Sequence, residues 1–246
     1  MRVVRLLECE PELGLRVPVD HIARARNELV VHVAEIEPGS ALSPIDLIER
    51  AGMGYIVLEG ILAREIILAG RMSAELLSVG DILQPTLTPR DDGLVRYHLQ
   101  WHVLERLRLA VLDDDFVAQA AQWPQVLGAL LERAIRRTHR MSLHAALLQL
   151  SPVETRLLVL MWHLAERWGH VTSAGIVIRL RLSHELLSTF VGTKRASVTT
   201  ALHRVTNSGK LSRREDGLWV LHGKPPHELY QVHWEPRHGV ETIVPV

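Results

Sequence analysis

Basic and hydroxyl-bearing side chains gather between residues 193 and 214, with a spacing that suits contact with an anion. Lys194 and Arg195 directly follow Gly192-Thr193 and open a segment of helical periodicity. Two cations in the first turn of a helix are unfavourable beside the positive end of its dipole unless an anion lies close to them. A nucleic-acid phosphate or a guanine edge would satisfy both side chains. The pattern therefore predicts nucleic-acid recognition at this segment.

Two short helices are expected to position these residues. Ser183 is the expected N-cap of a helix over residues 184–190, and Thr193 that of a second helix from Lys194 to about residue 206. Gly192 can supply the positive φ of the tight turn between them. Helical spacing divides the second helix into an apolar face of Val198, Ala201, Leu202 and Val205 and an acid-free face of Ala196, Thr200, His203, Arg204 and Asn207. This arrangement is typical of a helix-turn-helix, although an ordinary helical hairpin shares the pattern.

A β-hairpin is predicted directly after the second helix. Gly209 ends the helix, and residues 211–221 read as two strands joined at Asp216-Gly217. Arg213 and Arg214 lie on the first of these strands. A further short strand is predicted over residues 176–180, before the two helices. A basic hairpin behind a helix-turn-helix is a wing, which favours DNA recognition over the ordinary hairpin.

Charge is distributed unevenly along the chain. Lys and Arg together number 28, as do Asp and Glu, so the net charge is zero. Residues 151–246 carry twelve basic and eight acidic side chains, whereas residues 1–150 carry sixteen and twenty. The C-terminal part is therefore the expected partner of a polyanion.

Composition restricts the remaining classes of protein. A hydrophobic content of 47% with 23% charged residues is typical of a globular chain, and no apolar run approaches the roughly 20 residues of a membrane span. Cys9 is the only cysteine, which excludes an intrachain disulfide and a cysteine cage for zinc or an iron–sulfur cluster. The N-terminus shows no export signal, so we expect a cytoplasmic protein without membrane contact.

Short strands separated by turn signals are predicted for the N-terminal half. The expected strands are residues 29–33, 55–58, 61–62, 66–68, 99–104 and 107–112. The turn signals are Pro38-Gly39, Glu59-Gly60, Ala69-Gly70, Val79-Gly80 and Asp92-Gly93. Evenly spaced short strands indicate a β-barrel or β-roll.

A long helix with an unusual repeat is predicted after Trp123-Pro124. Apolar or small residues recur at alternating steps of four and three, at Leu127, Leu131, Ala134, Thr138, Met141, Ala145 and Leu148. The repeat favours a coiled coil between two copies of the chain, with packing on its own domain as the alternative. A new helix is predicted to start at Ser151-Pro152, with Ser151 as N-cap, Pro152 as first helical residue and Glu154 closing a capping box. We place a domain boundary there.

Several blocks of the chain resemble the Crp/Fnr family of transcription regulators, over about residues 28–224. The most specific are Val153–Leu158, Leu182–Leu187 and Val191–Leu202. Weaker blocks at 55–60, 75–81 and 107–116 look like the family's cyclic-nucleotide-binding β-roll. The resemblance implies an α+β chain with an N-terminal β-roll (jelly-roll) sensor domain over 1–116, a dimerisation helix over 117–150, a winged helix-turn-helix domain over 151–224 and a C-terminal extension over 225–246. It further implies a homodimer that binds double-stranded DNA at a two-fold symmetric operator, with RNA polymerase as a further candidate partner.

The resemblance also assigns roles on the second helix and the wing. The family's base-reading positions fall at Arg195, Ala196 and Thr200, where Ala replaces a frequent Glu and Thr a frequent Arg. The operator is therefore expected to differ from the family's best-known consensus. Phosphate contacts are expected from the surrounding basic and hydroxyl residues: Thr193, Lys194, Ser197, Thr199, Arg204, Lys210, Arg213 and Arg214.

Control by cyclic AMP is not expected. Family members that bind it hold its phosphate with a Gly-Glu pair and an Arg-Ser or Arg-Thr pair, and these positions fall at Gln84-Pro85 and Tyr97-His98. None of the family's residue types is present at these four positions, and only Arg90 and Arg96 could bind the phosphate in their place. Ser142 and Trp101 are candidate effector contacts. Trp101 shares one face of a predicted strand with Tyr97, Leu99 and Val103, and this face could instead belong to the ordinary hydrophobic core.

Another ligand, haem or gas sensing, or no ligand remain alternatives, so no cofactor is assigned. A metal site at His98 and His102 is not expected, because four residues along one strand separate them by roughly 13 Å. An enzyme is disfavoured: the chain has no phosphate-binding Gly loop and no nucleophile elbow, and N-capping explains Asp113-Asp114-Asp115. The remaining alternative to a DNA-binding regulator is a signal-binding or scaffold module whose helix-turn-helix mediates protein contacts.

Overall fold

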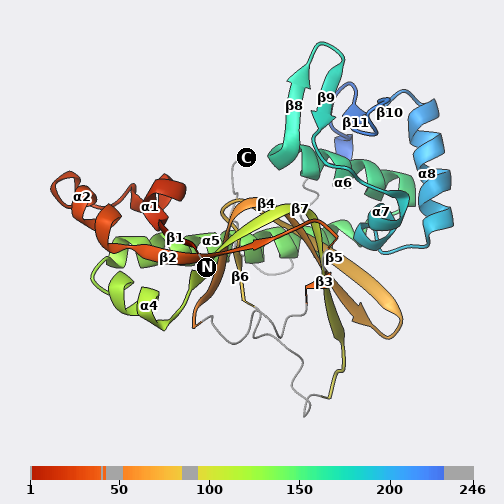
Figure 1. Ribbon diagram of the computed structural model, residues 1–246. Helices are drawn as coiled ribbons and strands as arrows, with labels where there is room; N and C mark the ends of the chain where they lie inside the picture. Colours follow the sequence, from red (N-terminus) through yellow and green to blue (C-terminus); the bar gives the residue numbers. More distant parts are fainter. Residues whose placement is uncertain (1, 40, 43–51, 85–93, 230–246) are drawn as a thin grey trace, which may run out of the picture. The chain divides into compact units, whose positions relative to one another are not determined.

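The computed structural model describes residues 2–39, 41–42, 52–84 and 94–229. Its chain divides into two compact units, Met1–Ala146 and Leu147–Val246 (Figure 1). The first unit is built on a seven-stranded sheet, and the second combines helices with a four-stranded sheet. All strand pairs in both sheets are antiparallel. The predicted α+β class is therefore confirmed.

Short helices lie between the first two strands of the large sheet, and the sequence analysis did not predict them. Strand β1 (Arg2–Arg5) pairs with β2 (Val30–Ile36), and α1 (Leu6–Cys9), η1 (Pro11–Gly14) and α2 (Val19–Glu28) lie between them in the chain. Leu6, Leu7 and Leu13 are fully buried in a core that also contains Phe116 and Val126. This segment is therefore part of a core that also includes residues more than a hundred positions away in the chain.

Two long strands dominate the first unit. The sheet contains β3 (Ala41–Leu42), β4 (Gly54–Leu68), β5 (Arg71–Ser78), β6 (Ile82–Leu83) and β7 (His98–Leu112) besides β1 and β2. Its order is β1-β2-β7-β4-β5, with β3 paired to β7 and β6 to β4. A core of Tyr55, Val57, Leu62, Leu77, Leu83, Trp101, Val103, Leu107, Leu109 and Val111 packs on this sheet. The sheet therefore supplies the β-roll expected from the sequence.

The expectation of many short strands is wrong for β4 and β7. Each runs for 15 residues, and the predicted turn at Glu59-Gly60 is an irregularity in the β4–β7 register. Gly60 has φ of +90°, and a Cβ there would lie 2.0 Å from the Arg106 carbonyl oxygen. The glycine therefore permits a close approach between paired strands and does not reverse the chain. Ala69-Gly70, by contrast, forms the predicted turn between β4 and β5, with positive φ at both residues.

The long helix lies where the sequence predicts it. The Asp113 carboxylate accepts a hydrogen bond from Phe116 N at 2.9 Å and caps α4 (Asp114–Ala120), which confirms the capping interpretation. Helix α5 (Pro124–Leu147) follows. Val126 and Leu130 on one of its faces are fully buried, and Arg133 on the same face pairs with the buried Glu10 at 2.7 Å. One stripe of α5 therefore packs on its own unit.

The second unit has the element order of a winged helix-turn-helix. It consists of α6 (Val153–Trp168), β8 (Gly169–Thr172), β9 (Gly175–Ile178), α7 (His184–Phe190), α8 (Arg195–Asn207), β10 (Leu211–Arg213), β11 (Trp219–Leu221) and η2 (His227–Leu229). Its sheet order is β10-β11-β9-β8. The expected cap of α6 is wrong. The helix begins at Val153 with the extended Pro152 as N-cap residue, so Ser151 lies outside the cap.

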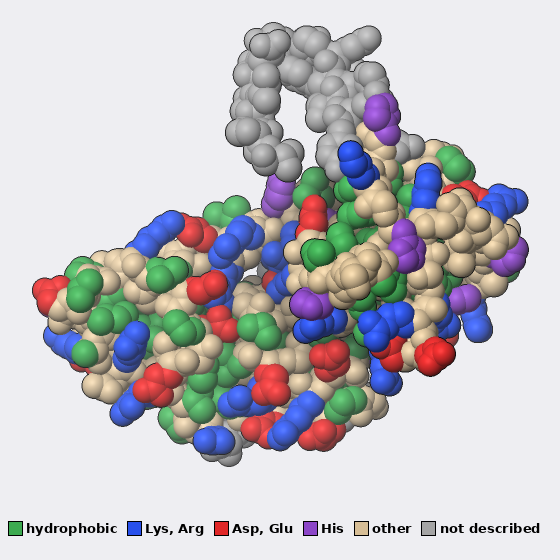
Figure 2. Space-filling view, turned by 90° about the horizontal axis from the view of Figure 1, so that it is seen from above, with side chains coloured by type: hydrophobic (Ala, Val, Ile, Leu, Met, Phe, Trp, Pro, Cys, Tyr) green, Lys and Arg blue, Asp and Glu red, His purple; other side chains and the backbone are tan. Residues whose placement is uncertain are grey.

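Exposed charges of both signs are interspersed on the face shown in Figure 2. The first unit contains exposed ion pairs, such as Arg24–Glu28 at 2.6 Å and Arg106–Glu35 at 2.8 Å. Exposed pairs of this kind add little stability, so the core carries the fold of this unit. Among the described helices, none is long and apolar enough to cross a membrane.

Candidate nucleic-acid interface

Helices α7 and α8 contact each other across a tight turn (Figure 1). Ser183 Oγ accepts a hydrogen bond from Leu186 N at 3.1 Å, which confirms the predicted N-cap of α7. Gly192 has φ of +63°, as the predicted turn requires. The predicted cap at Thr193 is wrong, because α8 begins at Arg195 and Lys194 holds the extended N-cap position without a side-chain hydrogen bond.

Arg156 of α6 holds this turn in place. Its Nε and Nη2 donate to the Leu150 carbonyl oxygen at 3.0 and 2.8 Å, and its Nη1 donates to the Val191 carbonyl oxygen at 2.7 Å. A planar guanidinium that donates to two separate backbone segments fixes their distance and orientation. The sequence shows Arg156 only as part of a resembling block and gives no local signal for this role.

The two faces of α8 differ as the sequence predicts. Val198, Ala201, Leu202 and Val205 are buried. Ala196, Thr200, His203, Arg204 and Asn207 are exposed. No acidic residue lies in the first turn, which begins with the exposed Arg195. The outer face of α8 can therefore approach a polyanion without a repelling carboxylate on the helix itself.

The three predicted base readers lie together at the start of α8. Arg195, Ala196 and Thr200 are all exposed. Thr200 Oγ1 donates to the Ala196 carbonyl oxygen at 3.1 Å, and Thr199 Oγ1 donates in the same way to Arg195. The hydroxyl protons are thus used within the helix, while the hydroxyl oxygens keep acceptor capacity for an outside donor.

The predicted phosphate contacts fall into two groups. Lys194, Ser197, Thr199 and Lys210 are exposed, and Thr193 is half-buried. Arg204 and Arg214 are exposed but already paired: Arg204 with Glu154 of α6, and Arg214 Nη2 with Asp216 Oδ2 at 3.0 Å. A backbone hydrogen bond and Arg204 together lower the pKa of Glu154. Arg204 and Arg214 would have to share their charge between a carboxylate and a phosphate.

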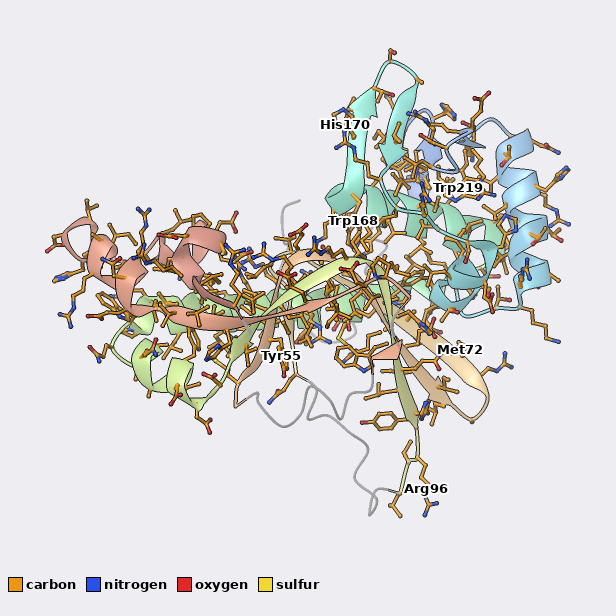
Figure 3. The ribbon with its side chains drawn as sticks, in the orientation of Figure 1. Tyr55, Met72, Arg96, Trp168, His170 and Trp219 are labelled. Carbon is orange, nitrogen blue, oxygen red and sulfur yellow. The ribbon has the colours of Figure 1, made fainter. Side chains whose placement is uncertain are left out.

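The wing is the predicted hairpin and holds Arg213 in a defined place. β10 pairs with β11 from Leu211–Leu221 to Arg213–Trp219, and Asp216 Oδ1 accepts from Leu218 N at 3.1 Å in the turn. The Arg213 guanidinium carbon lies 5.4 Å from the centre of the Trp219 ring. Trp219, which is labelled in Figure 3, is buried. Its Nε1 donates to the Leu182 carbonyl oxygen at 3.3 Å. The stack on Trp219 positions Arg213.

His184, the first residue of α7, connects the three elements of the interface. Its Nδ1 lies 3.1 Å from Thr199 Oγ1 of α8, and its ring centre lies 6.4 Å from that of Trp219. Burial lowers the pKa of His184, and the charges of Arg213 and Arg195 lower it further. The role of His184 is not predicted from the sequence, because its neighbours come from α8 and the wing.

Most of the predicted dimer seam lies away from the stripe of α5 that packs on its own unit, but Leu127 packs against the core of that unit. Leu131, Thr138, Met141 and Ala145 are exposed, with 61% of Leu131 and 41% of Met141 accessible. Leu127 and Ala134 are half-buried. The last predicted seam residue, Leu148, lies one position beyond the end of the helix at Leu147.

The candidate effector residues differ in their burial. Ser142 is exposed, and its hydroxyl donates to the Thr138 carbonyl oxygen at 3.1 Å. Trp101 is buried in the sheet core with Val103. Gln84, Arg96 and His98 are exposed and Tyr97 is half-buried, whereas Pro85 and Arg90 lie outside the described residues.

His98 and His102 lie on one strand, β7, as the metal argument assumes. His102 Nε2 lies 3.2 Å from Glu65 Oε2, which makes an ion pair when the ring is protonated. Within the described ranges, no three His, Cys, Asp or Glu side chains are grouped so that they could hold a metal ion.

Comparison with known proteins gives structural matches alone. No family model matches the sequence, and no curated protein matches it. Among the solved structures, a CRP/FNR-family transcriptional regulator of Thermus thermophilus is 18% identical, with a TM-score of 0.57 over 78% of this chain and 94% of that one. FixK2 of Bradyrhizobium japonicum is 15% identical, with a TM-score of 0.58 over 78% and 93%. The c-di-GMP-responsive regulator CLP of Xanthomonas campestris is 19% identical, with a TM-score of 0.57 over 79% and 95%.

These matches cover the sheet unit and the helical unit in one alignment, since more than three quarters of the chain is included. They agree with the winged helix-turn-helix found above and with the blocks of sequence that resemble the family. The chain has the fold of the CRP/FNR transcriptional regulators.

Proposed function

We propose that the chain is a homodimeric, sequence-specific DNA-binding transcription regulator of the Crp/Fnr type that acts in the cytoplasm. The observation that carries the proposal is the outer face of α8, which combines an exposed Arg195, hydroxyl side chains and no acidic residue, with its apolar face packed inward. Such a helix fits the major groove, where an arginine can donate two hydrogen bonds to a guanine. The basic wing behind it supplies further contacts to the backbone.

Within this proposal the interface residues divide by task. Arg195, Ala196 and Thr200 read bases at the start of α8. Thr193, Lys194, Ser197, Thr199, Arg204, Lys210, Arg213 and Arg214 contact phosphates. Arg213 is supported by its stack on Trp219, and Lys194 by its place at the N-terminal end of α8. His184 contacts Thr199 of α8 and Trp219 of the wing, and so links two elements that carry phosphate contacts.

Dimerisation along α5 is the second part of the proposal. The seam of Leu127, Leu131, Ala134, Thr138, Met141, Ala145 and Leu148 repeats every seven residues, and four of these side chains are exposed in the single chain. Exposed apolar residues at heptad spacing on a helix whose other stripe is buried are typical of a coiled-coil partner surface. Two copies joined in this way would present two recognition helices to a symmetric operator.

The experiment that tests the proposal is a selection of genomic fragments by the purified full-length chain, at two salt concentrations. We expect an inverted repeat whose half-sites lie one helical turn, roughly 34–36 Å, apart. We expect affinity to fall as salt rises, because phosphate neutralisation releases counterions. Lack of selective binding to any fragment would favour the scaffold alternative, in which the helix-turn-helix contacts a protein.

A further inference from the structure

One histidine lies where α7, α8 and the wing meet. His184 is the first residue of α7 and is half-buried. Its Nδ1 lies 3.1 Å from Thr199 Oγ1 of α8, and its ring lies beside Trp219 of the wing, with 6.4 Å between the ring centres. Arg213 of the wing stacks on the same Trp219. Two of the proposed phosphate contacts, Thr199 and Arg213, therefore lie close to His184.

The hydrogen bonds around Thr199 determine the tautomer of the His184 ring. The hydroxyl of Thr199 donates its single proton to the Arg195 carbonyl oxygen at 3.1 Å. Thr199 Oγ1 can therefore only accept a hydrogen bond from the ring, so the proton of the neutral imidazole lies on Nδ1. The other ring nitrogen, Nε2, is then an acceptor without a proton.

Nε2 of His184 is available to a partner outside the chain. Within the described residues it makes no hydrogen bond, and it is not one of the buried polar atoms that lack a partner, so it is accessible to solvent. In the neutral ring, Nε2 cannot bind a phosphate oxygen, because both atoms are acceptors. In the imidazolium form Nε2 carries an N–H, which can donate a charge-assisted hydrogen bond to a phosphate.

The charged groups that face His184 favour its neutral form in the free protein. Burial lowers the pKa of His184, and the charges of Arg213 on the wing and Arg195 on α8 lower it further. Glu185, the next residue of α7, is an exposed carboxylate and is not among the causes of this shift. A DNA phosphate at this position would act in the opposite direction, because a nearby negative charge favours the imidazolium.

We propose that His184 takes up a proton from solvent when the chain binds DNA and donates a hydrogen bond from Nε2 to a backbone phosphate. The inference rests on the proposed function, since it requires DNA against α8 and the wing. The proton adds to Nε2, and no covalent bond breaks. Affinity should therefore rise as the pH falls through the pKa of His184 in the complex, and level off below its lower pKa in the free protein.

The test is the affinity of the full-length protein for a duplex that carries the selected operator, measured between about pH 8 and about pH 6 at constant ionic strength. We expect the affinity of the wild type to rise at least about tenfold over this range, and most of the rise to be lost in His184→Gln. His203→Gln is the matched control, because His203 is an exposed histidine on the outer face of α8. This variant should keep the dependence of the wild type.

Calorimetry of operator binding in two buffers with different heats of ionisation counts the protons that are taken up. The wild type should take up more protons than His184→Gln, by up to about one per subunit. If His184→Gln does not fold, proton uptake by the wild type and the NMR titration of its His184 ring, with and without operator, still decide. The free protein should show the Nδ1–H tautomer, and the operator should raise the pKa of the ring.

Three results would overturn the proposal: the Nε2–H tautomer in the free protein, an equal pH dependence in the wild type and His184→Gln, or loss of that dependence in His203→Gln. Selective operator binding without proton uptake would remove only this role of His184. Lack of operator binding at every pH would contradict the proposed function itself, so the two failures are distinguishable.

Discussion

In the proposed DNA interface, Arg195 is the side chain that we expect to contribute most to recognition of the base sequence. It is exposed at the first position of α8, where a guanidinium can reach a base edge. Arg195→Ala is expected to cost about 1–3 kcal/mol of binding to a selected operator and to relax the preference at one base pair. Competition binding with operators that differ at single positions measures both effects. Unchanged affinity for the selected operator would remove Arg195 from the base-reading set.

Lys210 supplies the matched comparison. It is exposed at the start of the wing, outside the base-reading turn, and it carries the same charge. Lys210→Ala is expected to weaken specific and random DNA alike and to reduce the slope of log affinity against log salt by about 0.9, the value for one lost phosphate contact. The slope is measured on one duplex over a series of salt concentrations. A change in sequence preference would contradict the role of a phosphate contact.

His184 adds a pH dependence to the second unit. Burial and the charges of Arg213 and Arg195 lower its pKa below the ordinary value of 6.5. The unfolded chain therefore takes up this proton before the folded chain does. The free energy of unfolding should be unaffected by this group above about pH 6.5 and should fall as the pH drops through the lowered pKa.

The measurement is urea unfolding of the wild type and His184→Gln at several pH values between about 7.5 and 5, together with the imidazole titration by NMR. The variant should show a smaller loss of stability on the acid side. An imidazole pKa at or above 6.5 in the free protein would contradict the expectation.

The residues of the interface divide into those that local sequence reveals and those that it does not. The positions of Arg195 and Gly192 can be predicted from the sequence, because a cap, a turn and a helical face are short-range patterns. Arg156 and His184 are not, since Arg156 acts on a carbonyl 35 positions away and His184 on a ring from the wing. Thr193 shows the limit of local reading, because the start of a helix is uncertain by a residue.

At the scale of elements, helix α5 has one face that is buried in its own unit and another that is exposed. Val126, Leu130 and Arg133 pack on the sheet unit, whereas Leu131 and Met141 on the predicted seam are exposed. The heptad repeat in the sequence predicts the exposed stripe and says nothing of the buried one, where arginines serve as inward-facing residues through ion pairs. An apolar pattern alone cannot find a packing stripe that contains arginines.

Leu131→Glu tests the seam. In a dimer joined along α5 the new carboxylate would be buried without a partner, which should weaken dimerisation by at least about 3 kcal/mol, or a hundredfold in dissociation constant. Leu143→Glu is the matched control, since Leu143 is an exposed leucine of the same helix that lies off the seam. Analytical ultracentrifugation of both variants and the wild type measures the change. Equal effects of the two substitutions, or a monomeric wild type, would contradict the proposed seam.

The strands show a different limit of prediction. Alternation and Gly pairs correctly indicate a sheet unit and the Ala69-Gly70 turn, but Glu59-Gly60 has the same composition as a turn and lies inside a continuous strand. The difference comes from the Arg106 carbonyl on the opposite strand, which approaches the glycine closely. Such a contact joins residues more than forty positions apart, so no local window contains it.

At the scale of the whole molecule, we consider whether the sheet unit binds a cyclic nucleotide. The positions at which the resembling family holds a cyclic phosphate carry Gln84, Tyr97 and His98, with Pro85 outside the described residues. None of these three side chains supplies the permanently charged guanidinium that makes a bidentate pair with a phosphate. We therefore expect cyclic AMP to leave both the protein and its affinity for DNA unchanged.

Calorimetry of the full-length chain with cyclic AMP, and operator binding with and without the nucleotide, measure this expectation. A micromolar dissociation constant would contradict it, since such affinity is worth about 8 kcal/mol and requires a built phosphate site.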